Sequence, residues 1–335
     1  MSETLVYVAI SPELAASLEL DTELARLEGR ARVERWAGPG DPPPETVATA
    51  LERADVLLTG WRTPYLAPLE DWAPGRSRLR LVAHSAGTIK HLVPRAALER
   101  GLPLTHANLA LAESVAEFTI GAIIMARRQA FAARDRLRNH LPPVDPTSQH
   151  EIAGSTVGVI GASAIGERVL RLLAPLGAER LLYDPYCPPE RAAALGGRLV
   201  GLHELLRRSD VVTLHAPVTP ETLGMLGAPE FAAMKDGALF VNTARGRLID
   251  HAALLRELQA GRLFALLDVT DPEEPLPPDS PFYTLENCVV LPHMAAVTVE
   301  ARRRQSAYTV DEILRFLDGE PLRFQVTPAR WDTMA

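Results

Sequence analysis

Length, composition and charge set the first limits on this protein. The chain has 335 residues, enough for about two domains of roughly 150 residues each. Hydrophobic residues make up 47% and charged residues 23%, a globular composition that excludes a largely disordered chain. The formal net charge of −7 argues against a basic nucleic-acid-binding protein, so no nucleic-acid partner is expected.

The location of the protein is suggested by its cysteines and its apolar stretches. Cys187 and Cys288 are too few for a disulfide framework, which favours a reducing cytoplasm. The N-terminus has no basic region before its apolar run, so it predicts a strand and not a signal peptide. Glu113 and Glu117 interrupt the most apolar stretch, 109–126, which therefore predicts a buried helix rather than a membrane span.

The first third of the chain alternates short apolar runs with longer helical runs, the pattern of a parallel sheet covered by helices. The predicted strands are 5–10, 56–59, 81–84 and 104–106, with one helix over 12–27 and another ending near Gly101. A long helix is predicted from Leu111 to about Arg138, with Asn108 as its start cap. The polar, Pro-bearing stretch 140–154 is either a surface arm or a plain loop.

The same alternation restarts after this stretch and is stronger there. The predicted strands are 156–160, 180–183, 211–215, 238–242, 263–267 and 289–291, and the predicted helices are 165–176, 202–206, 251–260 and 299–317. The sequence therefore predicts an α/β fold with two Rossmann-like units, each a parallel sheet flanked by helices.

A glycine-rich turn joins the first strand of the second unit to its helix, the setting of a dinucleotide-binding fingerprint. Gly161 allows the tight turn, and Gly166 allows close packing of helix and strand. The N–H groups of Ala164 and Ile165 at the helix start would face a pyrophosphate. Ser163 stands where the pattern has its middle glycine. Either the loop shifts and the hydroxyl joins the contacts, or the site binds weakly; a tight turn without a ligand would have a similar sequence.

An acidic residue follows at the distance that ribose binding requires. Asp184 ends the next predicted strand, 18 residues after Gly166. An acid in this place accepts hydrogen bonds from the ribose hydroxyls and disfavours a 2′-phosphate, so it favours NAD over NADP. The start of an Asp-Pro turn is the structural alternative. Together, the turn and the acid predict an NAD site.

Three later strands end in side chains that suit catalysis. Arg245, Asp268 and His293 follow the strands in turn, with Glu273 and Glu274 a few residues after Asp268. Ligands bind at the carboxyl ends of the strands in open α/β sheets, so these residues could converge. An arginine can hold a carboxylate, and a histidine oriented by a carboxylate can exchange a proton near neutral pH. Hydride transfer between a nicotinamide and a 2-oxo or 2-hydroxy acid needs these groups and no metal.

Taken together, the segments resemble the D-isomer-specific 2-hydroxyacid dehydrogenases, the relatives of glycerate, formate and D-3-phosphoglycerate dehydrogenases. The resemblance extends over about residues 80–325 and depends on the order and spacing of its motifs, which are 114–117, 161–166, 183–185, 215–217, 242–246, 268–269, 274–275 and 292–293. It implies a flavodoxin-like substrate domain over 1–107 and 300–335, an NAD-binding Rossmann domain over 108–299, and an active site in the interdomain cleft.

The resemblance also implies roles for single residues. Arg245 would bind the substrate carboxylate and contact the cofactor, and His293 would be the acid/base. Counting forward from Asp268 gives Glu273 as its partner, whereas keeping the Glu-Pro dipeptide gives Glu274, which we favour. Asp268 would lie beside the nicotinamide. The other implied cofactor contacts are His215, Ala216, Pro217, Thr222, Thr243 and Ala244, and the loop implied to receive the substrate carboxylate is Ser85, Ala86, Gly87 and Thr88.

The substrate loop departs from the family pattern after Gly87, where Lys90 either favours an additional anionic group or is simply solvated. The resemblance implies an NAD-dependent 2-hydroxyacid dehydrogenase, a homodimer through its cofactor domain and the segment 111–150. Neither a metal nor a membrane partner is expected. Two alternatives are a non-catalytic NAD(H)-sensing protein on the same fold and a Rossmann oxidoreductase for amino acids, phosphonates or phosphite. The particular acid and the physiological direction stay open.

Overall fold

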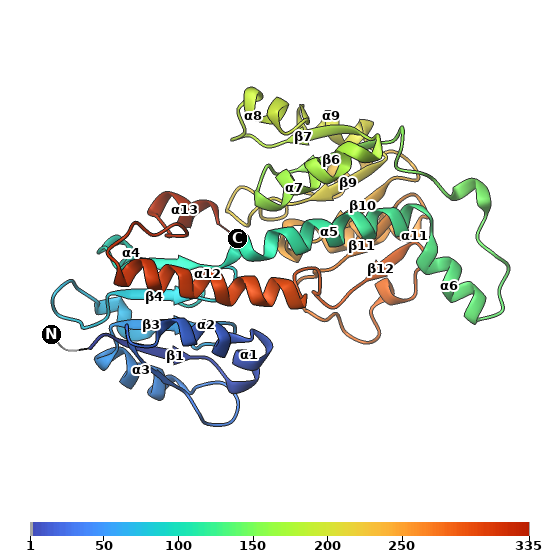
Figure 1. Cartoon of the computed structure of the whole chain (residues 1–335). Coiled ribbons are helices and arrows are strands. Elements are labelled where there is room, and N and C mark those ends of the chain that lie inside the picture. The colour runs from blue at the N-terminus through green and yellow to red at the C-terminus, as the bar shows by residue number, and fades with distance from the viewer. Residues whose placement is uncertain (1–2, 335) are drawn as a thin grey trace. The chain divides into compact units, whose positions relative to one another are not determined.

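Two parallel β-sheets organise the chain, one in each of two units. The computed structural model describes residues 3–334 (Figure 1). Unit 1 consists of Met1–Leu111 and Val297–Ala335, and unit 2 of Ala112–Ala296. The predicted α/β class, with two parallel sheets flanked by helices, is confirmed.

The sheet of unit 1 has the strand order β2-β1-β3-β4-β5, which is the 2-1-3-4-5 order of flavodoxin-like folds. Its strands are β1 (Leu5–Ala9), β2 (Arg32–Arg35), β3 (Val56–Thr59), β4 (Leu81–His84) and β5 (Leu104–His106). The helices that precede β5 are α1 (Pro12–Ser17), α2 (Leu20–Leu24), α3 (Pro44–Arg53) and α4 (Arg95–Glu99). The last segment of the chain adds α12 (Val299–Leu317) and α13 (Pro328–Thr333).

Both faces of this sheet carry a hydrophobic core, as expected of parallel strands covered by helices. Val6 and Val8 of β1 face the core that contains Val310 and Ile313 of α12. Tyr7, between them, belongs to the core on the other face, which also contains α3 and α13 residues. The last segment of the chain therefore completes both faces of the first sheet.

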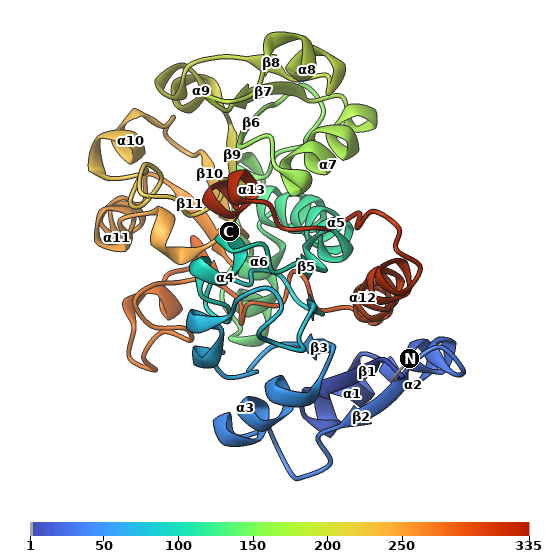
Figure 2. The ribbon, with the colours of Figure 1, turned by 90° about the vertical axis from the view of Figure 1, so that its left-hand side faces the viewer.

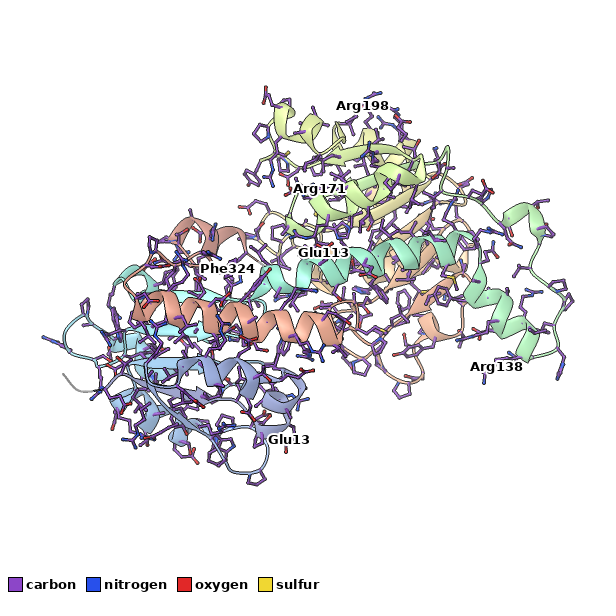
Figure 3. The ribbon with its side chains drawn as sticks, in the orientation of Figure 1. Glu13, Glu113, Arg138, Arg171, Arg198 and Phe324 are labelled. Carbon is purple, nitrogen blue, oxygen red and sulfur yellow. The ribbon has the colours of Figure 1, made fainter. Side chains whose placement is uncertain are left out.

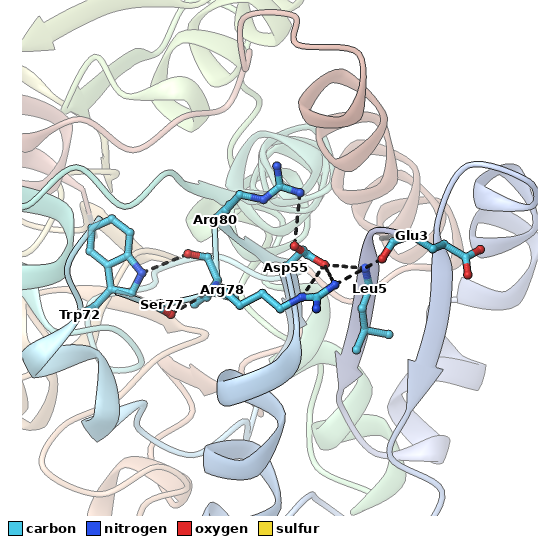
Figure 4. Close-up of polar contacts among 8 residues, drawn as sticks. Glu3, Leu5, Asp55, Trp72, Ser77, Arg78 and Arg80 are labelled. Atoms are coloured by element: carbon cyan, nitrogen blue, oxygen red, sulfur yellow. Dashed lines mark hydrogen bonds and ion pairs between the residues drawn. The ribbon is translucent and has the colours of Figure 1, made fainter. Parts of the chain in front are cut away.

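A buried carboxylate fixes the amino edge of this sheet. Asp55 accepts a hydrogen bond from the Leu5 N–H at 2.8 Å and forms ion pairs with Arg78 at 3.0 Å and Arg80 at 3.4 Å (Figure 4). The Asp55 main chain also links the neighbouring strands, since its N–H donates to Leu5 O and its carbonyl accepts from the Arg80 N–H. The amino ends of β1, β3 and β4 are thus tied together.

The sheet of unit 2 has the order β12-β11-β10-β9-β6-β7-β8. Its strands are β6 (Thr156–Ile160), β7 (Glu179–Tyr183), β8 (Arg198–Leu199), β9 (Val211–Leu214), β10 (Leu239–Asn242), β11 (Phe264–Leu267) and β12 (Cys288–Val290). Its helices include α7 (Ala164–Leu173), α8 (Pro189–Ala194), α9 (Leu202–Arg208), α10 (Ala228–Ala233) and α11 (His251–Gln259). Figure 2 shows α7 on one side of this sheet and α9, α10 and α11 on the other. The direction of winding reverses between β6 and β9, the point where such sheets bind ligands.

The helix predicted over 111–138 is two helices, which corrects the sequence interpretation. The first is α5 (Asn108–Arg127) and the second α6 (Ala130–Arg138), separated by Gln129 with a left-handed φ of 48°. Asn108 is the first helical residue rather than the cap before it. Figure 3 shows Arg138 at the far end of α6, a helix without buried residues.

Helix α5 is long and apolar enough to cross a membrane, but half of its most apolar window is buried. Ala116, Ala122 and Ile123 belong to the core that covers one face of the unit 2 sheet. This burial is the pattern of a core helix, as the acidic interruptions of the stretch predict.

Every predicted strand lies within one residue of an observed one at each end, but other elements differ. The helix expected over 12–27 is interrupted at Glu19, which has a left-handed φ of 48°. The sequence interpretation missed β2, β8, α3, α8, α10 and α13. Strand β2 reads Arg-Val-Glu-Arg and has no fully buried residue, so it lacks the apolar run from which a strand is recognised.

Candidate active site

The carboxyl edge of the unit 2 sheet brings the glycine-rich turn against the loop that follows β9. Gly161 has a left-handed φ of +99°, and a Cβ added there would lie 2.8 Å from Ala216 N. A Cβ added to Gly166 would lie 2.0 Å from Gly161 O. Both positions therefore require glycine, and they hold the turn at the point where the winding reverses.

Ser163 caps the helix that follows this turn. It has an extended backbone, and its Oγ accepts a hydrogen bond from the Gly166 N–H at 3.3 Å. Ala164 and Ile165 lie in the first turn, where N–H groups have no intrahelical acceptor. These N–H groups and the positive end of the helix dipole favour a negatively charged ligand. The residue that replaces the middle glycine thus serves the helix start.

Asp184 is tied to the same turn. Its Oδ2 accepts a hydrogen bond from the Ala162 N–H at 2.7 Å, and its Oδ1 accepts one from the Tyr186 N–H at 2.8 Å. Each carboxylate oxygen retains a second lone pair, and the side chain is partly exposed, so it can still accept ribose hydroxyls. Arg191, which the sequence interpretation did not single out, donates to Ala162 O at 3.1 Å. This cradle fits a dinucleotide.

His215 stabilises the loop after β9 rather than exchanging protons. Its side chain is buried, and Nε2 lies 2.9 Å from Thr213 Oγ1. Burial lowers the pKa of His215 to about 3, so the ring is neutral at physiological pH. Further along the loop, Thr222 Oγ1 donates to Pro217 O at 2.6 Å. Both side chains fix the path of the backbone at 215–217.

The turn after β10 is fixed from two sides. Asn242 closes it: Oδ1 accepts from the Ala244 N–H and Nδ2 donates to Arg245 O, each at 3.0 Å. A Cβ added to Gly246 would lie 2.2 Å from Thr270 O, so only glycine allows the loops after β10 and β11 to approach this closely. Asn242 is a positioning residue that sequence reasoning had placed in a motif without giving it a role.

Thr243 and Arg245 leave this turn in different directions. Thr243 is buried, and its Oγ1 lies 3.0 Å from Thr119 Oγ1 on α5. Arg245 Nη1 donates to Ala244 O at 2.6 Å. Burial lowers the pKa of Arg245, and the negative charge of Glu274 raises it in part. Within residues 3–334 no carboxylate forms an ion pair with this guanidinium, so it can bind an added one.

The structure distinguishes between the two glutamates that the sequence left as candidates. Glu274 Oε1 shares a hydrogen bond with His293 Nδ1. Glu273 points its side chain to solvent, and its carbonyl accepts a hydrogen bond from Thr270 Oγ1 at 2.7 Å. Because Nδ1 is engaged, His293 Nε2 is the ring nitrogen left for a ligand. The side chains of His293 and Glu274 are 43% and 36% exposed, so added groups can reach the pair.

Asp268 holds the turn that carries His293. Its carboxylate is buried and accepts hydrogen bonds from the Met294 N–H at 2.8 Å and the Ala295 N–H at 2.9 Å. Its carbonyl accepts the His293 N–H at 2.9 Å. His293 itself has a left-handed φ of 53°, which is uncommon for a residue with a side chain and requires such support. A nicotinamide contact of Asp268 stays a prediction.

The loop expected to receive the substrate carboxylate belongs to unit 1, where it follows β4. The Ser85 N–H donates to Thr59 O at 2.7 Å, and Ala86 O accepts from the Ala107 N–H at 3.0 Å. Among the described residues, none accepts a hydrogen bond from the N–H of Ala86, Gly87 or Thr88.

Lys90, at the end of this loop, is neither solvated nor free for an anion. Its Nζ donates to Met334 O at 2.6 Å, and burial lowers its pKa. This hydrogen bond joins the loop to the segment that follows α13.

A doubly wound sheet, a pyrophosphate cradle at its switch point and a His–Glu pair on the same edge define a dinucleotide-binding protein equipped for acid/base chemistry. Residues 120–295 match the family model described as D-isomer specific 2-hydroxyacid dehydrogenase, NAD binding domain. The chain belongs to this family, and its cofactor is NAD.

Individual relatives support this membership. The chain is 36% identical over 318 residues to D-3-phosphoglycerate dehydrogenase of Mycobacterium tuberculosis, covering 95% of this chain but only 58% of that protein. It is 31% identical over 302 residues to glyoxylate reductase of Korarchaeum cryptofilum, covering 89% of this chain and 90% of the relative. The crystal structure of a D-lactate dehydrogenase from Treponema pallidum aligns with a TM-score of 0.78 at 25% identity, covering 97% and 99% of the two chains.

Proposed function

We propose that this protein transfers a hydride between NAD and a small acid, interconverting a D-2-hydroxy acid and its 2-oxo acid. The observation that carries the proposal is the His293–Glu274 hydrogen bond on the same sheet edge as the unpaired Arg245 guanidinium. Relatives that are named phosphoglycerate dehydrogenase and glyoxylate reductase support the same class of reaction.

Each residue has a defined part in this reaction. Arg245 binds the carboxylate through paired N–H donors, and the 85–88 loop adds backbone N–H donors, a part proposed from the family resemblance. When bound, the nicotinamide supplies or accepts the hydride. His293 Nε2 donates a proton to the substrate oxygen during reduction and removes it during oxidation. Glu274 fixes the ring orientation and stabilises the protonated imidazole.

A substrate panel tests this function. The purified chain is mixed with NADH and single 2-oxo acids, among them glyoxylate, hydroxypyruvate and pyruvate, and the loss of NADH is followed. We expect turnover with at least one acid and a product of D configuration. NADH binding without turnover of any acid would instead indicate the NAD-sensing alternative. Turnover that needs ammonia, or NAD reduction by phosphite or a phosphonate, would indicate the other oxidoreductase classes.

Asp184 should determine the preference for NADH over NADPH. We expect Asp184→Ala to weaken NADH binding by about 10- to 100-fold, because hydrogen bonds to a charged carboxylate contribute about 1.5–3 kcal/mol. NADPH affinity should not fall, since the substitution removes a charge that repels the 2′-phosphate. Fluorescence titration gives both dissociation constants, with Glu190→Ala on α8 as an exposed control. An unchanged ratio of the two constants would remove Asp184 from the ribose site.

We also propose that the chain forms a homodimer through α6 and the arm that follows it. Helix α6 has no buried residue, and Leu137 and Leu141 are 78% and 49% exposed. A second copy is the partner most consistent with such apolar side chains on a projecting helix. The molar mass in solution would show this association. The cytoplasmic location and the interdomain position of the active site stay predictions.

A further inference from the structure

Unit 1 contains a half-buried cation without a counter-charge. The Arg302 guanidinium stacks on Trp61, with its carbon 4.2 Å from the ring centroid. Its Nη1 is buried and has no hydrogen-bond acceptor among the described residues. Burial lowers the pKa of Arg302, and no neighbouring carboxylate offsets this effect. Because buried charges in proteins are normally paired, this arrangement favours an anion that the chain itself does not supply.

The neighbouring arginines make the contrast clear. Arg303 forms an ion pair with Glu19 at 2.8 Å, and Arg304 Nε donates to Ala110 O at 3.0 Å. All three lie near the start of α12, where the positive end of the helix dipole disfavours cations. Arg303 and Arg304 are compensated by their partners. Arg302 has only the aromatic face of Trp61, a weaker compensation.

The position of Arg302 connects it with the 85–88 loop. Gln305 is three residues further along α12 and therefore lies on the same face of the helix. Its Nε2 donates to Ser85 O at 3.2 Å, and both residues are fully buried. Gln305 Oε1 and Ser85 Oγ also have no hydrogen-bond partner in the described part of the chain. Trp61 follows β3, the strand paired with β4, so all four residues lie near the carboxyl ends of two adjacent strands.

We propose that Arg302, stacked on Trp61, binds a second anionic group on the side chain of the 2-oxo acid, a carboxylate or a phosphate. The inference rests on the proposed function, in which Arg245 already supplies the guanidinium for the common 2-oxo carboxylate. The Ser85 hydroxyl is a further donor to the second anion. Gln305 is a positioning residue that holds the loop through Ser85 O. The substrate class is then a dianionic 2-oxo acid.

Matched substrate pairs test this proposal, since each pair differs only in the second anion. Oxaloacetate is compared with 2-oxobutanoate, 2-oxoglutarate with 2-oxopentanoate, and hydroxypyruvate phosphate with hydroxypyruvate, by kcat/KM with NADH. We expect the wild-type chain to favour the dianion at least tenfold in one pair. In that pair, Arg302→Gln should lower the dianion-to-monoanion ratio by about 100-fold, because charge-assisted hydrogen bonds are lost.

Two further variants complete the design. Arg302→Lys keeps the charge but loses the planar donor fork and should lie between the wild type and Arg302→Gln. Arg303→Gln removes an exposed arginine next to it, whose side chain is 59% exposed, and should leave the ratio within about twofold. Thermal unfolding shows whether each variant is folded. If Arg302→Gln does not fold, the comparison of Arg302→Lys with the wild type decides.

The outcomes separate this inference from the proposed function. A wild-type chain without preference for any dianion overturns the inference, as does an Arg302→Gln variant that slows both members of the pair equally. If no 2-oxo acid is turned over, the proposed function fails. Calorimetry with the NADH-loaded chain then measures binding of each pair directly. A dianion preference that Arg302→Gln abolishes would support the anion site on its own, and equal binding of both members would refute it.

Discussion

Replacing His293 by asparagine should lower kcat/KM for the preferred 2-oxo acid by about 10²- to 10⁴-fold, the range that general acid/base catalysis contributes. Asparagine cannot carry the proton that His293 Nε2 exchanges. The NADH dissociation constant should change little, because the cradle at Gly161 and Ser163 is built by a separate loop. Steady-state kinetics and fluorescence titration of NADH give the two quantities.

The control for this variant is His203→Asn, since His203 is exposed on α9 of the same unit. It should leave both quantities within about twofold, as expected for surface substitutions away from special features. Normal turnover by His293→Asn would show that another group moves the proton. A parallel loss of NADH binding would show instead that the substitution disturbs the turn held by Asp268.

Arg245→Gln should have the second largest effect, a loss of about 10²-fold in kcat/KM that falls mainly on the substrate KM. The guanidinium forms no ion pair with any described carboxylate, so a carboxylate of the substrate can take up its free donors. Charge-assisted, paired hydrogen bonds are worth more than the neutral ones that glutamine offers. Arg245→Lys should recover only part of the loss, because lysine lacks the planar fork.

Arg247 provides the matched control, two residues further along the same short helix. Its side chain is 65% exposed, and its nearest acidic atom is 3.9 Å away on Asp271. Arg247→Gln should leave kcat/KM within about twofold. Equal effects of the two substitutions would mean that general positive charge, and not a fixed carboxylate contact, explains the role of Arg245.

The strands could be predicted because their signal is local. Apolar runs such as 211–214 and 239–242 are buried on both faces of a parallel sheet and stand out without any tertiary information. The breaks at Glu19 and Gln129 could not be predicted in this way. Both residues adopt a left-handed backbone although neither is glycine, and no glycine or proline marks the break in the sequence.

The site shows the same limit at the level of side chains. The spacing of motifs located Arg245 and His293, but an extra residue between Asp268 and His293 left Glu273 and Glu274 equally consistent with counting. Only the hydrogen bond to His293 Nδ1 distinguishes them. Arg302 was hidden for a related reason, since three consecutive arginines are alike in sequence and differ only in what each contacts.

The discontinuous composition of unit 1 has a consequence for how the chain reaches its native state. Unit 2 is one continuous stretch, Ala112–Ala296, whereas both cores of unit 1 include residues from the last segment, such as Ile313 and Trp331. During synthesis, domains fold as units once their chain has emerged. The dinucleotide-binding half can therefore fold on the ribosome first, while the earlier-made residues of unit 1 wait, incompletely covered, for the final helices.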